Sequence, residues 1–213
     1  MRAVPLGDSA ITIVLGNDRS TDLLNRVHAT AAALAAEQLP DVQDIVPAYL
    51  GVAVFYDSLR TTFSEMAAKL LPICEQATAS TAGSHKIREH EIRVTYDGAD
   101  LAQVAQTCGL SIDEVIARHS DRRYTVDLLG FVPGFAYLSE LDASLQLPRR
   151  PQPRPRVAAG SVAIAGAQTA VYPLDTPGGW HIIGRTEKVM FDPLRDPPAL
   201  LRAGDLVRFV PVQ

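Results

Sequence analysis

The spacing of hydrophobic and polar residues divides the chain into segments of different period. Alternation over residues 10–15 predicts a strand with one buried face, and apolar residues at helical spacing predict a helix over 20–37. Two extended runs, 42–46 and 49–56, follow. Thr62-Phe63-Ser64-Glu65 then matches the capping box that opens a helix. The order strand, helix, two strands and helix predicts a small two-layer α/β domain.

The pattern changes near the middle of the chain. Residues 77–84 are small, polar and without periodicity, so we expect a linker there. It would join an N-terminal domain of residues 1–84 to a second domain of residues 85–213. The second domain begins with a predicted strand and two short helices, which occupy 91–96, 100–108 and 111–119.

Short strands dominate the rest of the second domain. Eleven of the 15 prolines and eight of the 14 glycines lie from Gly130 onward, among short runs of valine, isoleucine and phenylalanine. Such punctuation is typical of a β-barrel or β-sandwich. We therefore predict an α+β protein, with a small α/β domain followed by a β-barrel domain. The predicted strands here are 161–165, 170–172, 181–184, 189–191 and 206–210.

Composition narrows the function classes. The formal net charge is −4, with 47% hydrophobic and 21% charged residues, so no overall field attracts nucleic acid or an anionic membrane. No apolar run approaches the roughly 20 residues of a membrane-spanning helix, and no secretory signal pattern is visible. We expect a cytoplasmic protein that binds neither membrane nor nucleic acid. A helix-turn-helix-like stretch at 104–118 has Asp113 and Glu114 where a DNA reader needs basic or amide side chains.

Several familiar reactive motifs are absent. The five histidines and two cysteines show no metal-ligand spacing, so we expect no metal site held by this chain alone. There is no Gly-x-Ser-x-Gly elbow, phosphate-binding loop or dinucleotide fingerprint. His119 is a candidate general base, although a lone histidine at a helix end is more often a structural residue.

Glycine, proline and aromatic residues mark the candidate binding site. Residues 130–137 read Gly-Phe-Val-Pro-Gly-Phe-Ala-Tyr and follow a predicted strand, which fits either a barrel corner packed by aromatics or the wall of a ligand pocket. Residues 176–180 are predicted to form a turn that presents the only tryptophan. The candidate substrate-binding residues are Gly130, Phe131, Pro133, Gly134, Phe135, Tyr137, Thr169, Tyr172, Pro177, Gly178, Gly179 and Trp180.

Arginines supply the candidate anion-binding groups. The tract 147–156 carries four arginines among prolines that hold it extended, and guanidinium groups suit carboxylate or phosphate. Arg149 and Arg150 fit a solvated surface loop equally well, whereas Arg156 lies where the barrel begins and is the better candidate. Arg185 supplies a second cation, and Gln168 could hydrogen-bond an amide or carboxylate. The candidate catalytic residues are therefore His119, Arg156, Gln168 and Arg185.

The same segments resemble one known family. Residues 130–138, the Pro/Arg tract, 159–169, 177–180 and 183–186 look like the allophanate hydrolase subunit 1 family, in the family's order. That family includes one of the subunits of the bacterial ATP-dependent 5-oxoprolinase, the one designated B, and an inhibitor of a sporulation histidine kinase. From residue 90 onward the resemblance rests on these motifs, whereas before residue 90 it rests only on the general pattern of the sequence. It implies a cyclophilin-like barrel for the second domain.

The resemblance also implies partners and a reaction. It implies a hetero-oligomer with a subunit 2 protein and, for 5-oxoprolinase, a third subunit, in which 5-oxoproline, ATP and water become glutamate, ADP and phosphate. ATP, with Mg²⁺, would be bound by the assembled complex. Arg156 and Arg185 would then stabilise the transferring phosphoryl group, Gln168 would orient the amide and His119 would handle a proton.

Two other functions stay open at this level. One is a subunit of a urea- or allophanate-processing system of the biotin-dependent carboxyltransferase type; the chain has no Met-Lys-Met biotin carrier motif, so this function would need other chains. The other is a non-enzymatic inhibitor of a histidine kinase, which would require an exposed apolar patch on the barrel.

Overall fold

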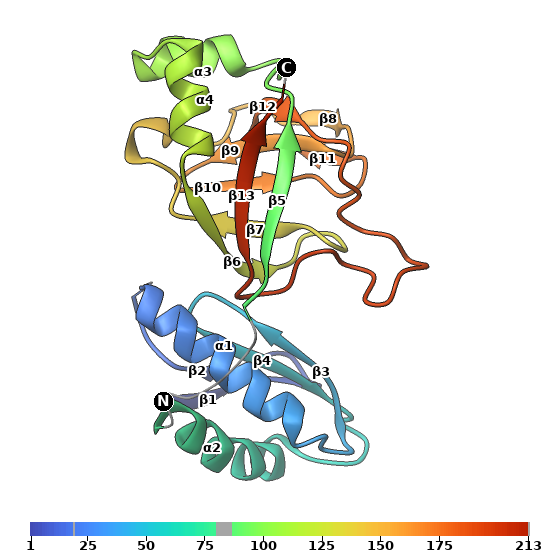
Figure 1. Ribbon diagram of the computed structural model, residues 1–213. Coiled ribbons are helices and arrows are strands. Elements are labelled where there is room, and N and C mark those ends of the chain that lie inside the picture. The colour runs from blue at the N-terminus through green and yellow to red at the C-terminus, as the bar shows by residue number, and fades with distance from the viewer. Residues whose placement is uncertain (19, 80–86, 213) are drawn as a thin grey trace. The chain divides into compact units, whose positions relative to one another are not determined.

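The computed structural model describes residues 1–18, 20–79 and 87–212 (Figure 1). The chain forms two compact units, Met1–Lys86 and Ile87–Gln213. The mixture of helices and strands and the barrel-like sheet of the second unit confirm the predicted α+β class.

The first unit is a four-stranded antiparallel sheet with two helices packed on one face. The strand order is β1-β2-β4-β3. Ile11 and Ile13 lie opposite Val54 and Val52, so these side chains share one face and contact the buried residues of both helices. The elements are β1 (Arg2–Pro5), β2 (Ala10–Val14), α1 (Thr21–Ala36), β3 (Val42–Pro47), β4 (Gly51–Tyr56) and α2 (Phe63–Ala79).

Local signals place the helix starts of this unit correctly. The Ser20 side chain accepts a hydrogen bond from the Leu23 backbone N–H at 3.1 Å, and Thr62 and Glu65 form the predicted reciprocal cap. Two expectations differ from the structure. The four-residue strand β1 was not predicted, because it is too short to show a period. Residues 77–79, predicted as linker, continue α2, and the remainder of that linker, 80–84, lies outside the described residues.

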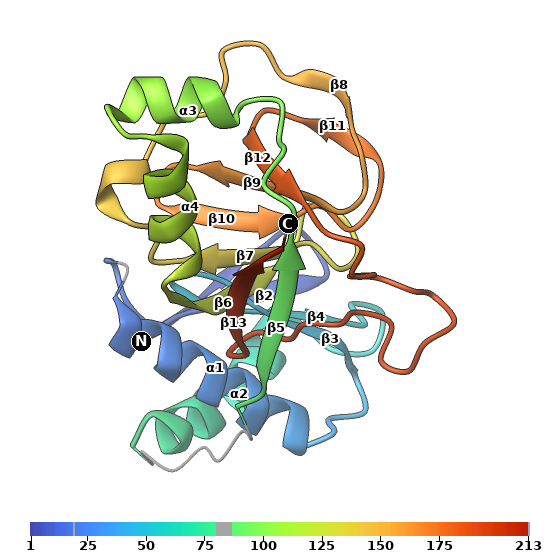
Figure 2. The same ribbon diagram turned by 45° about the horizontal axis from the view of Figure 1, so that its top comes forward.

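The second unit is a seven-stranded sheet that curls until its two ends nearly meet (Figure 2). The order is β12-β9-β10-β7-β6-β13-β5, antiparallel except for the β13–β5 pair. Thr95, just after β5, and Arg185, at the end of β12, exchange two backbone hydrogen bonds of 2.9 Å and join the ends. The strands are β5 (Glu89–Val94), β6 (Arg123–Leu129), β7 (Ala136–Ser139), β9 (Ser161–Ala165), β10 (Gln168–Val171), β12 (His181–Arg185) and β13 (Leu206–Pro211).

Two helices and a side ribbon complete this unit. Helix α3 (Leu101–Cys108) packs against β12 and α4 (Ile112–Ser120) packs against β13, with a short turn of 3₁₀ helix at Ala143–Leu145. Strands β8 (Arg154–Val157) and β11 (Thr176–Gly178) form a separate two-stranded ribbon, consistent with a Pro/Arg tract kept out of the main sheet. Residues 189–191, predicted as a strand, contribute only an isolated bridge from Phe191 to Ala199.

Candidate functional site

An aromatic cavity of about 180 Å³ opens in the second unit beside the side ribbon. Phe135 is at its centre and makes edge-to-face contacts with surrounding rings at centroid distances from 4.9 to 5.7 Å. These rings come from the loop after β6, from β7, from the residue after β10 and from the turn before β12. They belong to Phe131, Tyr137, Tyr172 and Trp180.

The backbone of the 130–135 loop explains how Phe131 reaches the cavity rim. Phe131 has φ of 72° and Gly134 has φ of 78°, both in the left-handed region. A non-glycine residue there costs of order 1–2 kcal/mol, so Phe131 is held by its surroundings. A Cβ at Gly134 would lie 2.6 Å from the Phe191 Cβ, so only glycine fits. The result is an aromatic side chain that is 61% exposed at the mouth of a pocket.

The opposite wall depends on Gly178. A Cβ at this position would lie 2.3 Å from the Tyr172 hydroxyl oxygen, so any side chain would displace the Tyr172 ring or the strand. The remaining lining residues include Arg149 and Pro153 of the Pro/Arg tract, with Pro177 and Gly179. Among the described residues that line the cavity, Arg149 is the one charged group, and its side chain is exposed.

A buried carboxylate, Asp100, anchors the arginine tract beside this cavity. Its Oδ1 accepts hydrogen bonds from Arg150 Nη1 at 2.6 Å and from Arg154 Nη2 at 2.7 Å, and its Oδ2 accepts one from the Ile182 backbone N–H at 2.7 Å. Burial acts to raise the pKa of Asp100, but the hydrogen bonds from Arg154 and Ile182 and the charge of Arg150 outweigh it and hold the pKa below its usual value. Arg150 and Arg154 are therefore structural cations, which leaves Arg149 for a ligand.

His119 and Thr169 lie together in the core. The Thr169 hydroxyl donates to the Ala163 carbonyl at 3.0 Å, so it accepts from His119 Nε2–H at 2.8 Å. The Nδ1 atom of His119 is then the acceptor for the Tyr96 hydroxyl at 2.7 Å. His119 is fully buried and stacked on Phe209, and burial lowers its pKa to about 3. The structure thus makes it a neutral link between two hydroxyl groups, and neither His119 nor Thr169 lines the aromatic cavity.

None of the other candidate catalytic residues lines the aromatic cavity, and each approaches a different carboxylate. Gln168 Nε2 approaches Asp127 Oδ2 at 3.4 Å, and Asp127 also accepts from the Ser139 hydroxyl. Arg156 pairs with Asp175 at 2.5 and 2.9 Å on the surface.

Arg185 donates to Asp97 at 2.8 Å and lines a second, larger cavity of about 600 Å³. The structure therefore places most of the predicted aromatic residues around one cavity, and the predicted catalytic residues lie outside its lining.

Two groups that shape the site escaped sequence reasoning. Asp100 precedes a short helix and looks like an ordinary helix-start residue, and only the fold brings it to arginines about fifty positions away. Arg149 could not be distinguished from its neighbour Arg150 in the sequence. Among the described residues no cluster of histidine, cysteine and carboxylate side chains could hold a metal ion.

The comparisons with known proteins agree with this fold. The family model for the carboxyltransferase domain, subdomain C and D, matches residues 1–201. The chain belongs to this carboxyltransferase family. A relative in Bacillus subtilis (strain 168), the 5-oxoprolinase subunit designated B, is 40% identical over 216 residues, covering 96% of this chain and 90% of that protein. A protein of the same name in Escherichia coli O157:H7 is 41% identical over 213 residues, covering 99% and 95%. The resemblance read from the sequence is thereby confirmed.

Solved structures extend the likeness. The crystal structure of TTHA0988 matches with a TM-score of 0.84 and 40% identity over 96% of this chain, which spans only 40% of that longer chain. The Kluyveromyces lactis urea amidolyase matches with a TM-score of 0.79 at 16% identity, over 99% of this chain and 15% of its own, and so shows the shared fold alone. No helix in the described part of the chain is long and apolar enough to cross a membrane.

Proposed function

We propose that this chain is a subunit of an ATP-dependent 5-oxoprolinase and supplies part of a composite site. The observation that carries the proposal is the near full-length match, at 37–41% identity, to 5-oxoprolinase subunits of one name, the subunit designated B, from three bacteria. The reaction would convert 5-oxoproline, ATP and water to glutamate, ADP and phosphate, with ATP and Mg²⁺ held by the assembled subunits.

The aromatic cavity suits the chemistry of this substrate. 5-Oxoproline is a small flat lactam with one carboxylate, and the cavity combines aromatic walls with a single cation, Arg149. In this proposal the rings of Phe135 and Trp180 pack against the lactam ring, and Arg149 binds the carboxylate. The described residues that line the cavity include no carboxylate, thiol or imidazole that could act as base or nucleophile. The groups that activate the lactam would therefore come from the partner subunits.

The activating step is a phosphoryl transfer to the lactam oxygen. The γ-phosphoryl group would pass from ATP to this oxygen, and one water would attack the activated carbon so that the ring C–N bond breaks and glutamyl phosphate forms. A second water would then hydrolyse this acyl phosphate to glutamate and phosphate. Arg156 and Arg185 remain candidates for contacting the transferring group, and each would exchange a surface carboxylate, Asp175 or Asp97, for phosphate. Orientation of the amide by Gln168 and proton transfer by His119 stay predictions, and His119 would act through Thr169 or Tyr96.

The experiment is reconstitution with substrate-dependent ADP release as the readout. The chain is purified together with subunit 2 and the third subunit, and ADP is measured with and without 5-oxoproline. Arg149→Met should raise KM for 5-oxoproline about ten-fold or more, with a smaller effect on kcat. This rise corresponds to the loss of a hydrogen bond to a charged group, which contributes about 1.5–3 kcal/mol.

Arg202→Met is the matched control, because Arg202 is exposed and lines neither cavity. Absence of 5-oxoproline-dependent ADP release from the three proteins together would refute the proposed activity. An unchanged KM in the Arg149→Met complex would refute only the placement of the substrate.

A further inference from the structure

The barrel of the second unit has an open seam. Strand β5 pairs with β13 on one side, and on the other side it meets β12 only through the single bridge between Thr95 and Arg185. Backbone groups of a strand point alternately to its two sides. The Arg88 carbonyl accepts from the Leu206 N–H and the Val94 carbonyl accepts from the Val212 N–H, so even-numbered residues face β13. The odd-numbered residues Glu89, Glu91 and Arg93 face the seam, where the described residues offer no partner strand.

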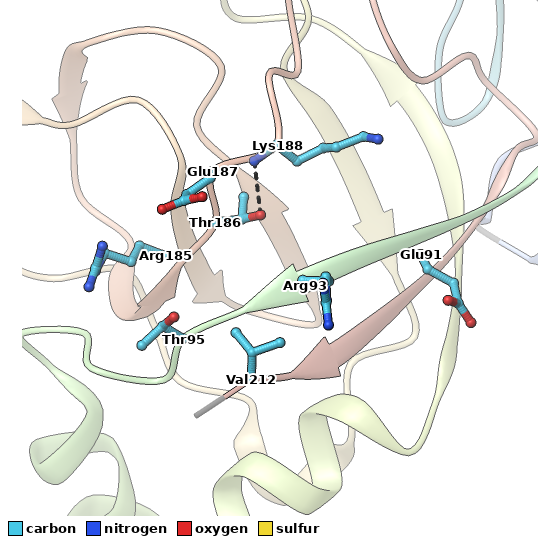
Figure 3. A pocket seen from close by; sticks show the side chains of 8 residues that line it. All are labelled: Glu91, Arg93, Thr95, Arg185, Thr186, Glu187, Lys188 and Val212. Carbon is cyan, nitrogen blue, oxygen red and sulfur yellow. Dashed lines mark hydrogen bonds between the residues drawn. The ribbon is translucent and has the colours of Figure 1, made fainter.

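The larger cavity lies along this seam. Figure 3 shows Glu91 and Arg93 along β5 and Thr95 just beyond its end, with Thr186, Glu187 and Lys188 on the chain that leaves β12. The side chains of the odd-numbered β5 residues point outward, whereas Ile92 and Val94 are buried in the core. The cavity is therefore bordered by outward-facing charged side chains and by a row of backbone groups that have no partner among the described residues.

The charges of the seam are unevenly compensated. Glu89 pairs with Arg123 at 3.0 Å and Glu91 pairs with Arg208, so arginines of neighbouring strands neutralise both carboxylates of β5. Arg185 is paired with Asp97 and also feels the charge of Glu187, which helps to raise its pKa.

Arg93 and Lys188 are exposed and have no ion pair within the described residues. Glu187 also lines the cavity, is exposed and has no ion pair within the described residues, so the two cations exceed it by one and leave the seam with a net positive charge.

We propose that this seam binds an extended acidic segment of another polypeptide, which adds to β5 as a further strand. The backbone of the segment would pair with Glu89, Glu91 and Arg93, over about 13 Å of strand at ~3.4 Å per residue. An aspartate or glutamate beside Arg93 on the outer face would lie within reach of Arg93, because directly opposed side chains are only about 5 Å apart at Cβ. Lys188 lines the same cavity and would add to the positive charge there.

Two observations favour a polypeptide over a small oxyanion. The free groups are a periodic array of N–H donors and C=O acceptors, which a strand satisfies and a phosphate does not. A relative with the same fold, TTHA0988, also carries three fifths of its chain outside the matched part, so further polypeptide accompanies this fold in that protein. The inference does not depend on the proposed oxoprolinase activity.

Residue-resolved hydrogen exchange on the full chain tests the inference. The probe is a blocked pentapeptide, Thr-Val-Glu-Val-Thr, compared with its lysine counterpart, Thr-Val-Lys-Val-Thr, and with inorganic phosphate. The glutamate peptide should slow exchange at the amides of Glu89, Glu91 and Arg93 and leave those of His90 and Ile92 unchanged, since the latter already face β13. It should bind about five-fold more tightly than the lysine peptide, a modest ratio because the ion pairs are exposed.

Charge reversal supplies the specificity control. Arg93→Glu should invert the preference so that the lysine peptide binds more tightly. Lys188→Glu should weaken binding of the glutamate peptide without altering strand β5, because Lys188 lies in a loop. Protection of the odd-numbered amides with this charge preference supports the inference. A different outcome is that phosphate changes hydrogen exchange at Arg93 and Lys188 while the glutamate peptide leaves the β5 amides unprotected. That result would overturn the inference in favour of a small-oxyanion site. No response to either probe, or equal binding of both peptides, would also overturn it.

Discussion

Asp100→Asn provides the most informative test of how the aromatic site is held. Asp100 is 2% exposed, and it accepts from two arginines and one backbone N–H with its two oxygens. Asparagine has the same shape but only one acceptor oxygen, so its amide nitrogen must face either the Ile182 N–H or the two guanidinium groups. At least one donor then meets another donor, and the positive charges of Arg150 and Arg154 lose their counter-ion.

The magnitude follows from the burial of the three groups. Breaking a buried ion pair from one side costs about 3–5 kcal/mol, and the lower end applies here because the arginine side chains are 27% and 25% exposed. A loss of about 3 kcal/mol should lower Tm by roughly 10 °C for a domain of this size. Trp180, the only tryptophan, belongs to the cavity, so its fluorescence reports unfolding at the site itself.

Asp175→Asn is the matched control, because it removes a carboxylate from a surface pair with Arg156 whose side chains are 77% and 44% exposed. Exposed pairs contribute little, so this variant should unfold within a degree or two of the unmodified chain. Equal Tm values for the two variants would show that the buried cluster does not stabilise the site, and the reasoning above would be wrong.

The pH dependence of the same cluster has a defined sign. The pKa of Asp100 is held below its usual value in the folded state, so the unfolded chain takes up this proton first as pH falls. The stabilisation is complete above about pH 4, the usual pKa of an aspartate, and is lost as pH falls through the lower folded pKa. The difference in Tm between the unmodified chain and Asp100→Asn should therefore shrink below about pH 4.

Two further substitutions test the cavity and the core. Gly178→Ala should abolish 5-oxoproline-dependent turnover of the assembled complex by forcing Tyr172 aside. Gly130→Ala is its control, since Gly130 is outside the cavity lining and a Cβ there would make only ordinary contacts, 3.5 Å from Leu128 Cδ1 and 3.9 Å from Tyr137 Cε2. Equal activity of the two variants would show that the cavity is not the substrate site. Tyr96→Phe leaves His119 Nδ1 without its donor and should cost about 1–3 kcal/mol in urea unfolding. A stability unchanged by Tyr96→Phe would mean that His119 takes another partner.

The sequence predicts local structure, such as helix starts, wherever residues close together in the chain determine it. The cap of α1 by Ser20 and the capping box of α4 between Ser111 and Glu114 involve residues three positions apart, so the pattern contains all the information needed. The same reasoning failed where the pattern was too short, as for β1, or where apolar residues reflect a long-range contact. Phe191 is such a residue: it packs against Gly134 and does not extend a strand.

The tertiary structure decided which candidate groups act together. By itself the sequence identified the aromatic and glycine residues of the cavity, because their composition is unusual and their segments match a family. It could not tell Arg149 from Arg150, since that difference depends on Asp100, fifty residues away in the chain. It placed His119 at a helix end but could not show that the barrel closes over it. Long-range pairing, which is absent from local sequence pattern, sets both burial and charge compensation, and these determine which side chains remain available to a ligand or a partner.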